Sequence, residues 1–290
     1  NGTIDLGNVT LGLSFSFTPA VGDSFNIVAA AGGLTGTFNG IADNDVITVN
    51  SQTFRVDYTA NSVVVTKVDI DPPGIASTNV NQEFLNDANV GPNALVLTVN
   101  FDEPMNTAIN PVVTFTQDVS SSLSLTSSQW ADADTYVFKW SLADANIPTT
   151  NLSPNVTGGQ DVAGNVMAPS TVTGTNIDTH NPTVLDINDG DANNRAPVNQ
   201  ALTFTVAFDE DINAGSVSAA DFDNAGTAAI TVGAITETAP GIFSVVVTPT
   251  TEGTLRLRIP AGAVILNTAN NALAAGVQDD AVVNVANPIL

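Results

Sequence analysis

The chain has 290 residues, of which 29 are acidic and 6 are basic, so its formal charge at neutral pH is −23. Nucleic acid and anionic membrane surfaces would repel such a chain, and we expect neither as a partner. Cysteine is absent, which excludes disulfides and thiolate metal sites. No apolar run approaches the roughly 18 residues of a membrane span, so direct membrane insertion is not expected. Thr, Val, Asn and Gly are abundant, and this composition predicts an all-β fold.

Residues 1–68 have the pattern of a small β-meander. Three strand-like runs, separated by turn residues, lie in the stretch TGTFNGIADNDVITVNSQTFRVDYTANSVVVTK. The stretch is similar to the closing segment of β-solenoid or repeat regions in secreted bacterial proteins. A plain small β-module is the alternative. We interpret 1–68 as the C-terminal part of a larger β-rich module.

From residue 69 onwards the chain repeats itself. LTVNFDE at 97–103 recurs as FTVAFDE at 204–210, and YVFKW at 136–140 recurs as FSVVV at 243–247. The aromatic positions of YVFKW align with a plain core stripe in FSVVV, so we expect core packing there and not a ligand platform. Trp130, in a loop-like stretch, is the better candidate for an exposed aromatic side chain.

Further matches set the boundaries of the repeat. DVAGN at 161–165 aligns with NTANN at 267–271, and an Asn-Pro pair opens the second copy and recurs near the end of the chain. We therefore predict β-sandwiches at 69–180 and 181–286, with 287–290 starting a following repeat. Both ends of the chain are then expected to be cuts through a longer array.

Each copy has the strand density of an immunoglobulin-like sandwich, with about seven short strands in roughly 100 residues. In LRLRI at 255–259, the leucines and the isoleucine should point inward and the arginines outward. SVSAADF predicts one helical turn, with Ser218 as its N-cap and Asp221 in the capping-box position. The strands expected in the second copy are 183–187, 201–208, 228–235, 242–248, 254–259, 262–266 and 280–285.

The order of these motifs resembles a known family. FDE, SAADF, a strand pair, GAVxxxxxN and an acidic linker ending in proline are together similar to the bacterial Ig-like domains of large surface and biofilm-associated adhesins. The resemblance covers roughly residues 69–290. It implies a spacer role in long extracellular stalks at the bacterial cell surface, with calcium at some domain junctions.

Acidic residues gather where strands end and where the linkers begin. If strand ends and linkers meet at one pole of each sandwich, their carboxylates converge, and a divalent cation with oxygen ligands would relieve their repulsion. The alternative is that these are solvated turn carboxylates that need no metal. The candidate Ca²⁺ ligands are Asp69, Asp71, Asp102, Glu103, Asp178, Asp209, Glu210 and Asp211.

A second acidic stretch, DINDGDANNRA at 186–196, superficially resembles an EF-hand loop. Counted from Asp186, its glycine is the fifth residue and not the sixth, and the twelfth residue is Pro197 in place of the bidentate glutamate. An EF-hand is therefore not expected. A looser calcium loop would use Asp186, Asp189 and Asp191. An ordinary loop rich in Asx turns is the alternative.

Nothing in the sequence indicates catalysis. His180 is the only histidine and lies in a linker, which is a poor place for a base that must be held rigidly. We therefore predict that the chain is not an enzyme but a structural spacer segment of a large bacterial cell-surface protein. Its partners would be neighbouring domains of the same chain. Two alternatives stay open: a subunit that associates with itself in a surface layer or filament, and the accessory domains of a secreted polysaccharide-degrading enzyme.

Overall fold

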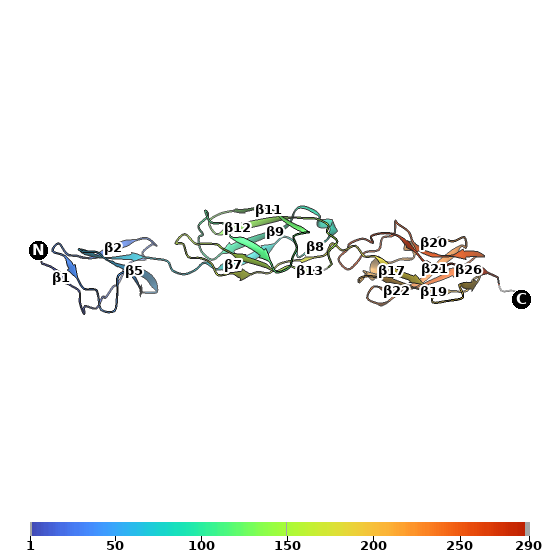
Figure 1. Ribbon diagram of the computed structural model, residues 1–290, viewed down its shortest axis with the longest axis horizontal. Coiled ribbons are helices and arrows are strands. Elements are labelled where there is room, and N and C mark those ends of the chain that lie inside the picture. The colour runs from blue at the N-terminus through green and yellow to red at the C-terminus, as the bar shows by residue number, and fades with distance from the viewer. Residues whose placement is uncertain (1, 149, 288–290) are drawn as a thin grey trace.

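The computed structural model describes residues 2–148 and 150–287, and Figure 1 shows an extended molecule. Three groups of strands follow one another along its long axis, and the two ends of the chain lie at opposite ends. The fold class predicted from the sequence, all-β with sandwich-type domains, is confirmed. Of the predicted start of a following repeat at 287–290, residues 288–290 lie outside the described residues.

The N-terminal group contains the predicted meander. Strands β4, β5 and β6 are consecutive and antiparallel, and β2 pairs with β6 to complete a sheet in the order β2-β6-β5-β4. Phe54, Val56, Val63 and Val65 are fully buried in its core. Outside this sheet, β1 pairs with β3 in parallel. The bounds are β1 (Ile4–Asp5), β2 (Ser24–Ala29), β3 (Leu34–Thr35), β4 (Asp45–Val49), β5 (Gln52–Tyr58) and β6 (Ser62–Lys67).

The first copy of the repeat forms three sheets, ordered β11-β12-β9-β7, β13-β16-β8 and β10-β14-β15. A 3₁₀ turn, η1 (Asp87–Asn89), follows β8. The strands are β7 (Ile75–Val80), β8 (Phe84–Leu85), β9 (Gly91–Phe101), β10 (Val112–Phe115), β11 (Leu123–Trp130), β12 (Thr135–Leu142), β13 (Thr150–Asn151), β14 (Pro154–Thr157), β15 (Ser170–Thr171) and β16 (Asn176–Ile177).

The second copy also forms three sheets, ordered β21-β22-β19-β17, β18-β26-β23 and β20-β24-β25. Two 3₁₀ turns, η2 (Ala214–Ser216) and η3 (Ala219–Asp221), follow β19. The strands are β17 (Val184–Asn188), β18 (Arg195–Pro197), β19 (Leu202–Phe208), β20 (Asp223–Asn224), β21 (Ile230–Ala239), β22 (Ile242–Pro249), β23 (Gly253–Leu255), β24 (Leu257–Ile259), β25 (Val277–Gln278) and β26 (Val283–Ala286).

The two copies share one topology. Each sheet of the first copy has a counterpart with the same strand order in the second, including one parallel pair, β16 with β8 and β18 with β26. Even the register is shared, because Phe138 lies opposite Leu97 while Val245 lies opposite Phe204. These four side chains are the ones that the repeat aligned, so the alignment of the sequence is also an alignment of the folds.

The aromatic stripe of β12 belongs to the core. Tyr136, Phe138 and Trp140 are 0%, 2% and 5% exposed. Trp130, the candidate for an exposed aromatic side chain in a loop-like stretch, instead ends β11 and packs edge-on against Tyr136, with ring centroids 4.9 Å apart. Its indole lies partly buried against the core because β11 continues through the stretch that looked like a loop.

Two strand predictions in the second copy need correction. Residues 254–259 keep the predicted alternation, but the strand breaks at Arg256, whose N–H donates to the side chain of Asn224 at 2.7 Å. The chain there leaves the sheet of β26 for the sheet of β20 and β25. Residues 262–266 form no strand, because the N–H of Val264 is taken by the Asp221 carboxylate at 2.8 Å.

The turn around Ser218 forms as predicted. Its N–H and its hydroxyl both donate to Asp221 Oδ2 at 2.8 Å, and residues 219–221 form η3. Three short strands, β18, β20 and β25, were not expected from the sequence, since two or three residues carry too little alternation to be recognised. Among the residues that the structure describes, no helix is both long and apolar enough to span a membrane.

Candidate functional site

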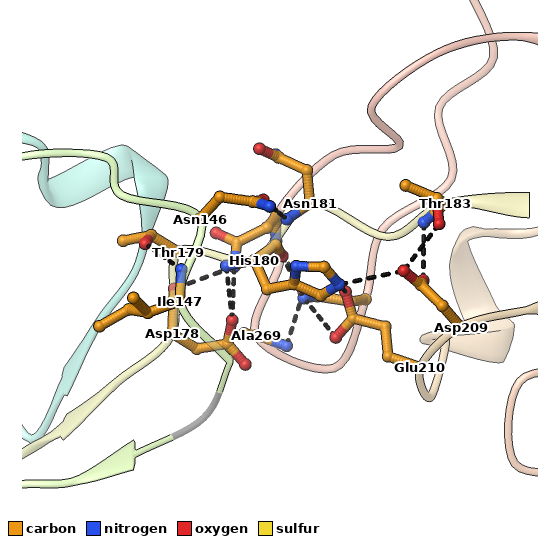
Figure 2. A network of polar contacts seen from close by, with 12 residues as sticks. Asn146, Ile147, Asp178, Thr179, His180, Asn181, Thr183, Asp209, Glu210 and Ala269 are labelled. Carbon is orange, nitrogen blue, oxygen red and sulfur yellow. Dashed lines mark hydrogen bonds and ion pairs between the residues drawn. The ribbon is translucent and has the colours of Figure 1, made fainter.

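The two linkers lie against strand ends, and this is where most of the predicted acidic residues are found. The linker between the copies runs through Asp178 to Asn181 and meets the end of β19 (Figure 2). The ring of His180 points at two carboxylates, with Nε2 3.1 Å from Asp209 Oδ2 and 3.9 Å from Glu210 Oε1. These three side chains form one of two groups whose ligand atoms all lie within 4.8 Å of one another, among the residues described.

Asp209 is also the anchor for the first residues of the second copy. It accepts hydrogen bonds from the N–H and the hydroxyl of Thr183, both at 2.7 Å. Burial acts to raise the pKa of Asp209, but the hydrogen bonds from Thr183 and His180 outweigh it and lower that pKa. The carboxylate therefore stays charged and holds the linker in place.

The second junction, where the linker between the two copies meets the second copy, contains two fully buried asparagines. Asn267 Nδ2 donates to the His180 carbonyl and to Glu210 Oε2, both at 3.0 Å. Asn271 Nδ2 donates to the carbonyl of Asp178 at 2.9 Å, and its Oδ1 accepts the N–H of Asp87, from the first copy, at 2.9 Å. Burial raises the pKa of Glu210, and the hydrogen bond from Asn267 opposes that shift. The acidic groups here thus have amide and imidazole partners.

The two copies also touch directly at this junction. Asn86 Nδ2 donates to the carbonyl of Ala269 at 2.7 Å, and Asn181 Nδ2 donates to Asp87 Oδ2 at 2.7 Å and to the Ala272 carbonyl at 3.0 Å. The turn after β8 is thereby hydrogen-bonded to the 267–272 turn of the next copy. Such a contact restrains the angle between the copies.

The first junction, before β7, brings together Asp69, Glu103 and Asp161, the second group whose ligand atoms lie within 4.8 Å of one another. Asp161 is fully buried, and its two oxygens accept hydrogen bonds from Asn165, from the backbone N–H at 2.8 Å and from Nδ2 at 2.7 Å. Asn165 Nδ2 also donates to the carbonyl of Asp69 at 3.2 Å. Burial raises the pKa of Glu103 to about 7, and the nearby Asp69 and Asp161 add to the shift.

The two junctions have the same plan. The N–H of Gly74 donates to Asp102 Oδ1 at 2.8 Å, as that of Thr183 donates to Asp209 Oδ1 at 2.7 Å. Asn165 donates to the linker carbonyl of Asp69, and Asn271, its counterpart in the second copy, donates to the linker carbonyl of Asp178. This common frame allows the two junctions to be compared residue by residue.

The chemistry of the two junctions differs at two positions. Asp71 lies three residues before Gly74, and His180 lies three residues before Thr183. The second junction therefore has a histidine where the first has an aspartate. The isolated bridge of Asn267 with Ile212 matches that of Asp161 with Met105, so the second junction has an amide where the first has a carboxylate. Both exchanges remove negative charge from the second junction, where an amide and an imidazole lie beside the carboxylates, whereas the first junction gathers three carboxylates.

Of the predicted metal ligands, the structure brings together Asp69 with Glu103, and Asp209 with Glu210. Asp71 is exposed and outside the first group. Asp102 and Asp178 accept hydrogen bonds from backbone N–H groups instead. Asp102 accepts the N–H of Gly74, and Asp178 Oδ1 accepts the N–H of His180 at 2.9 Å.

Asp211 is exposed and lies in neither group. The sequence reasoning missed Asp161, although the aligned DVAGN and NTANN segments marked its position. Asp186, in β17, and Asp189 and Asp191, in the loop that follows, belong to neither group and line a cavity of about 470 Å³.

No family model matches the chain, and no curated protein matches it either. Among solved structures, the Yersinia pseudotuberculosis adhesin InvE is 13% identical, with a TM-score of 0.28, and the match covers 72% of this chain and 60% of that one. An endo-fucoidan hydrolase of glycoside hydrolase family 107, MfFcnA4, is 14% identical over 95% of this chain and 44% of its own, with a TM-score of 0.22. The chain thus spans less than two thirds of either structure.

Proposed function

We propose that the chain is a non-catalytic structural segment of a larger bacterial cell-surface protein, a spacer in an extracellular adhesin-type stalk. The observation that carries this proposal is the end-to-end order of the strand groups in Figure 1, together with the repeated topology of the two copies. A series of separately packed cores gains length with every copy, and each unit contacts mainly its neighbours. Neighbouring units of the same chain are the partners that this role requires.

The surroundings of His180 support a non-catalytic role. In the part of the chain that is described, its ring nitrogen pairs with Asp209 and approaches Glu210, and a hydroxyl or amine nucleophile is not among its partners. A histidine that activates a nucleophile of the protein, as in a Ser-His-Asp arrangement, needs that nucleophile within hydrogen-bond reach. Here the ring instead ties the linker to the end of β19.

Small-angle X-ray scattering and light scattering test the spacer role directly. A spacer should be an extended monomer, with and without Ca²⁺. A compact particle in solution would contradict the end-to-end arrangement. Ordered assembly on adding Ca²⁺ would favour the surface-layer alternative, in which the chain binds further copies of itself.

The proposal includes a calcium ion at the first junction. Ca²⁺ binds carboxylate oxygens, and Asp69, Glu103 and Asp161 present three carboxylates at one point. Among the described residues, no lysine, arginine or histidine forms an ion pair with any of the three. A bound cation would neutralise their charge, and these residues would then tie the linker to both the end of β9 and the 161–165 turn.

The first junction can be tested by giving it the chemistry of the second. Asp161→Asn keeps an oxygen for the N–H of Asn165 and adds an amide that can donate to Glu103, as Asn267 does to Glu210. We expect Ca²⁺ to raise the melting temperature of the unmodified chain over that in chelator, and to raise that of the variant much less. Equal calcium effects in both proteins would reject the metal at this junction and leave the spacer role untouched.

The reciprocal exchange, Asn267→Asp, is the matched control. It replaces the amide that donates to Glu210 with a like charge, and it leaves the backbone turn in place. We expect it to lower the melting temperature in chelator, measured by differential scanning calorimetry. No change in chelator would mean that Glu210 does not depend on the amide.

A further inference from the structure

The cavity of about 470 Å³ in the second copy is lined from two parts of the chain that are far apart in the sequence. One wall is the loop after β17, and the other is the segment between β25 and β26. The carboxylates that line it are Asp186, Asp189, Asp191, Asp279 and Asp280. The last two were not foreseen from the sequence, because they are brought to the loop only by the sheet topology.

Two carboxylate oxygens in this cavity are buried and have no hydrogen-bond partner among the described residues: Asp279 Oδ2 and Asp189 Oδ2. Asp279 is only 4% exposed, and its other oxygen accepts the N–H of Ala281 at 2.8 Å. The other oxygen of Asp189 accepts the N–H of Asp191 at 3.0 Å. Burial raises the pKa of Asp279, and the nearby charges of Asp189 and Asp186 add to that shift.

The backbone holds Asp279 rigidly in this position. Its N–H donates to the carbonyl of Leu257 at 2.8 Å, and its own carbonyl accepts from Arg256 Nε at 2.5 Å. Arg256 therefore binds the backbone carbonyl of Asp279, and Oδ2 of the Asp279 carboxylate has no hydrogen-bond partner among the described residues. A buried carboxylate oxygen without a hydrogen-bond partner is costly.

The first copy shows that the fold does not need a carboxylate here. Register places Val172 where the second copy has Asp279, since each residue follows the short strand that pairs with β14 or β24. The N–H of Val172 makes the equivalent bond, to the carbonyl of Pro154 at 2.9 Å. Val172 packs against the hydrophobic core. The acidic group at this place is therefore a feature of the second copy alone and is not a requirement of the sandwich.

We propose that this cavity is a Ca²⁺ site, with Asp279 and Asp189 as its central ligands and Asp186, Asp191 and Asp280 completing its acidic wall. A hard cation partners the two buried oxygens that lack donors, and Ca²⁺ suits a loop because it accepts six to eight oxygen ligands in flexible geometry. Binding would join the loop after β17 to the segment before β26. The site is separate from both junctions and does not depend on the spacer role.

Calorimetric titration of the full chain with CaCl₂ tests the site. Asp279→Val, which installs the residue of the first copy, should reduce the binding stoichiometry by one ion, with the circular dichroism spectrum unchanged. Asp118→Asn, at an exposed turn, removes the same charge and should leave the stoichiometry as it is. Asp189→Asn, which keeps the fold of the loop, should weaken binding at the same site at least tenfold.

Variants of the first junction distinguish this proposal from the one above. In Asp161→Asn the cavity should still bind one Ca²⁺, and the double variant Asp161→Asn with Asp279→Val should bind none at either place. Unchanged stoichiometry in Asp279→Val, or loss of all binding in Asp161→Asn alone, would overturn the cavity site. An unmodified chain that binds no Ca²⁺ would overturn both calcium sites but not the extended structure.

Discussion

At the residue scale, one of the two exchanges that separate the junctions replaces a carboxylate, Asp161, with an amide, Asn267. Asn267 donates to Glu210, whereas Asp161 in the same place faces Glu103 with a like charge. An amide can both accept and donate, but an ionised carboxylate can only accept. The side chain at this position thus decides whether the neighbouring glutamate has a hydrogen-bond donor or a second carboxylate beside it.

A pH dependence follows for the cation-free protein. In chelator, Glu103 has a pKa of about 7 in the folded chain against an ordinary value of 4.5. The folded state therefore holds this proton more tightly, and the free energy of unfolding should fall as pH rises from about 4.5 to about 7. The loss is at most on the order of 3 kcal/mol, and solvent screening reduces it.

Glu103→Gln is the comparison for that measurement. Denaturant unfolding of the two proteins, each in chelator, should show a difference in free energy that grows across this pH range, because only the parent gains a charge there. Carboxylates far from Glu103 titrate equally in both proteins and cancel. A difference that does not vary with pH would mean that Glu103 titrates as an ordinary glutamate.

At the scale of elements, the β9–β12 pair is the centre of the first copy. Phe138 lies opposite Leu97, and both are almost completely buried. The ring of Phe138 also stacks on that of Trp140 with centroids 5.7 Å apart, and meets Tyr136 edge-on at 4.8 Å. A side chain with this many close-packed neighbours leaves a large cavity when it is removed.

Phe138→Ala should therefore destabilise the first copy by about 3–5 kcal/mol. Lys139→Ala, one residue along the same strand and only partly buried, should cost far less. Differential scanning calorimetry would show the transition of the first copy shifted downward while the remaining transitions keep their position. A uniform shift of all transitions would mean that the three hydrophobic clusters do not unfold separately.

At the scale of the whole molecule, the angle between the two copies depends on how strongly the second junction resists bending. Asn271 connects both sides of it: its side chain accepts the N–H of Asp87 from the first copy and donates to the carbonyls of Asp178 and His180 in the linker. These bonds join two copies whose cores lie apart along the axis in Figure 1. The direction of the rod at this point thus rests on a few buried polar contacts.

Asn271→Ala should loosen this junction. It leaves buried backbone groups without partners, at a cost of about 1–3 kcal/mol for each group that water cannot reach. We expect a lower melting temperature for the second copy and, in small-angle scattering, a broader distribution of the longest dimensions. Asn151→Ala, at an exposed position, is the control. An unchanged scattering curve would show that the angle between the copies does not depend on Asn271.

The sequence by itself determined the all-β fold, the repeat and the core stripes. Alternation of apolar and polar side chains is a local property, and a strand such as β12 or β22 shows it whatever lies beside it. The capped turn at Ser218 was predictable for the same reason, since its partners are three residues apart. The general place of the acidic groups, at strand ends and linkers, also followed from local pattern.

Only the tertiary structure decided which of these groups meet. Asp161 meets Asp69 and Glu103, and Asp279 lines one cavity with Asp189, because sheet register and linker path bring together segments that are far apart in the chain. The strand break at Arg256 is decided in the same way, by the side chain of Asn224 on another strand. The local sequence pattern carries no information about contacts between such distant residues, because their geometry is fixed by how whole sheets pair and pack.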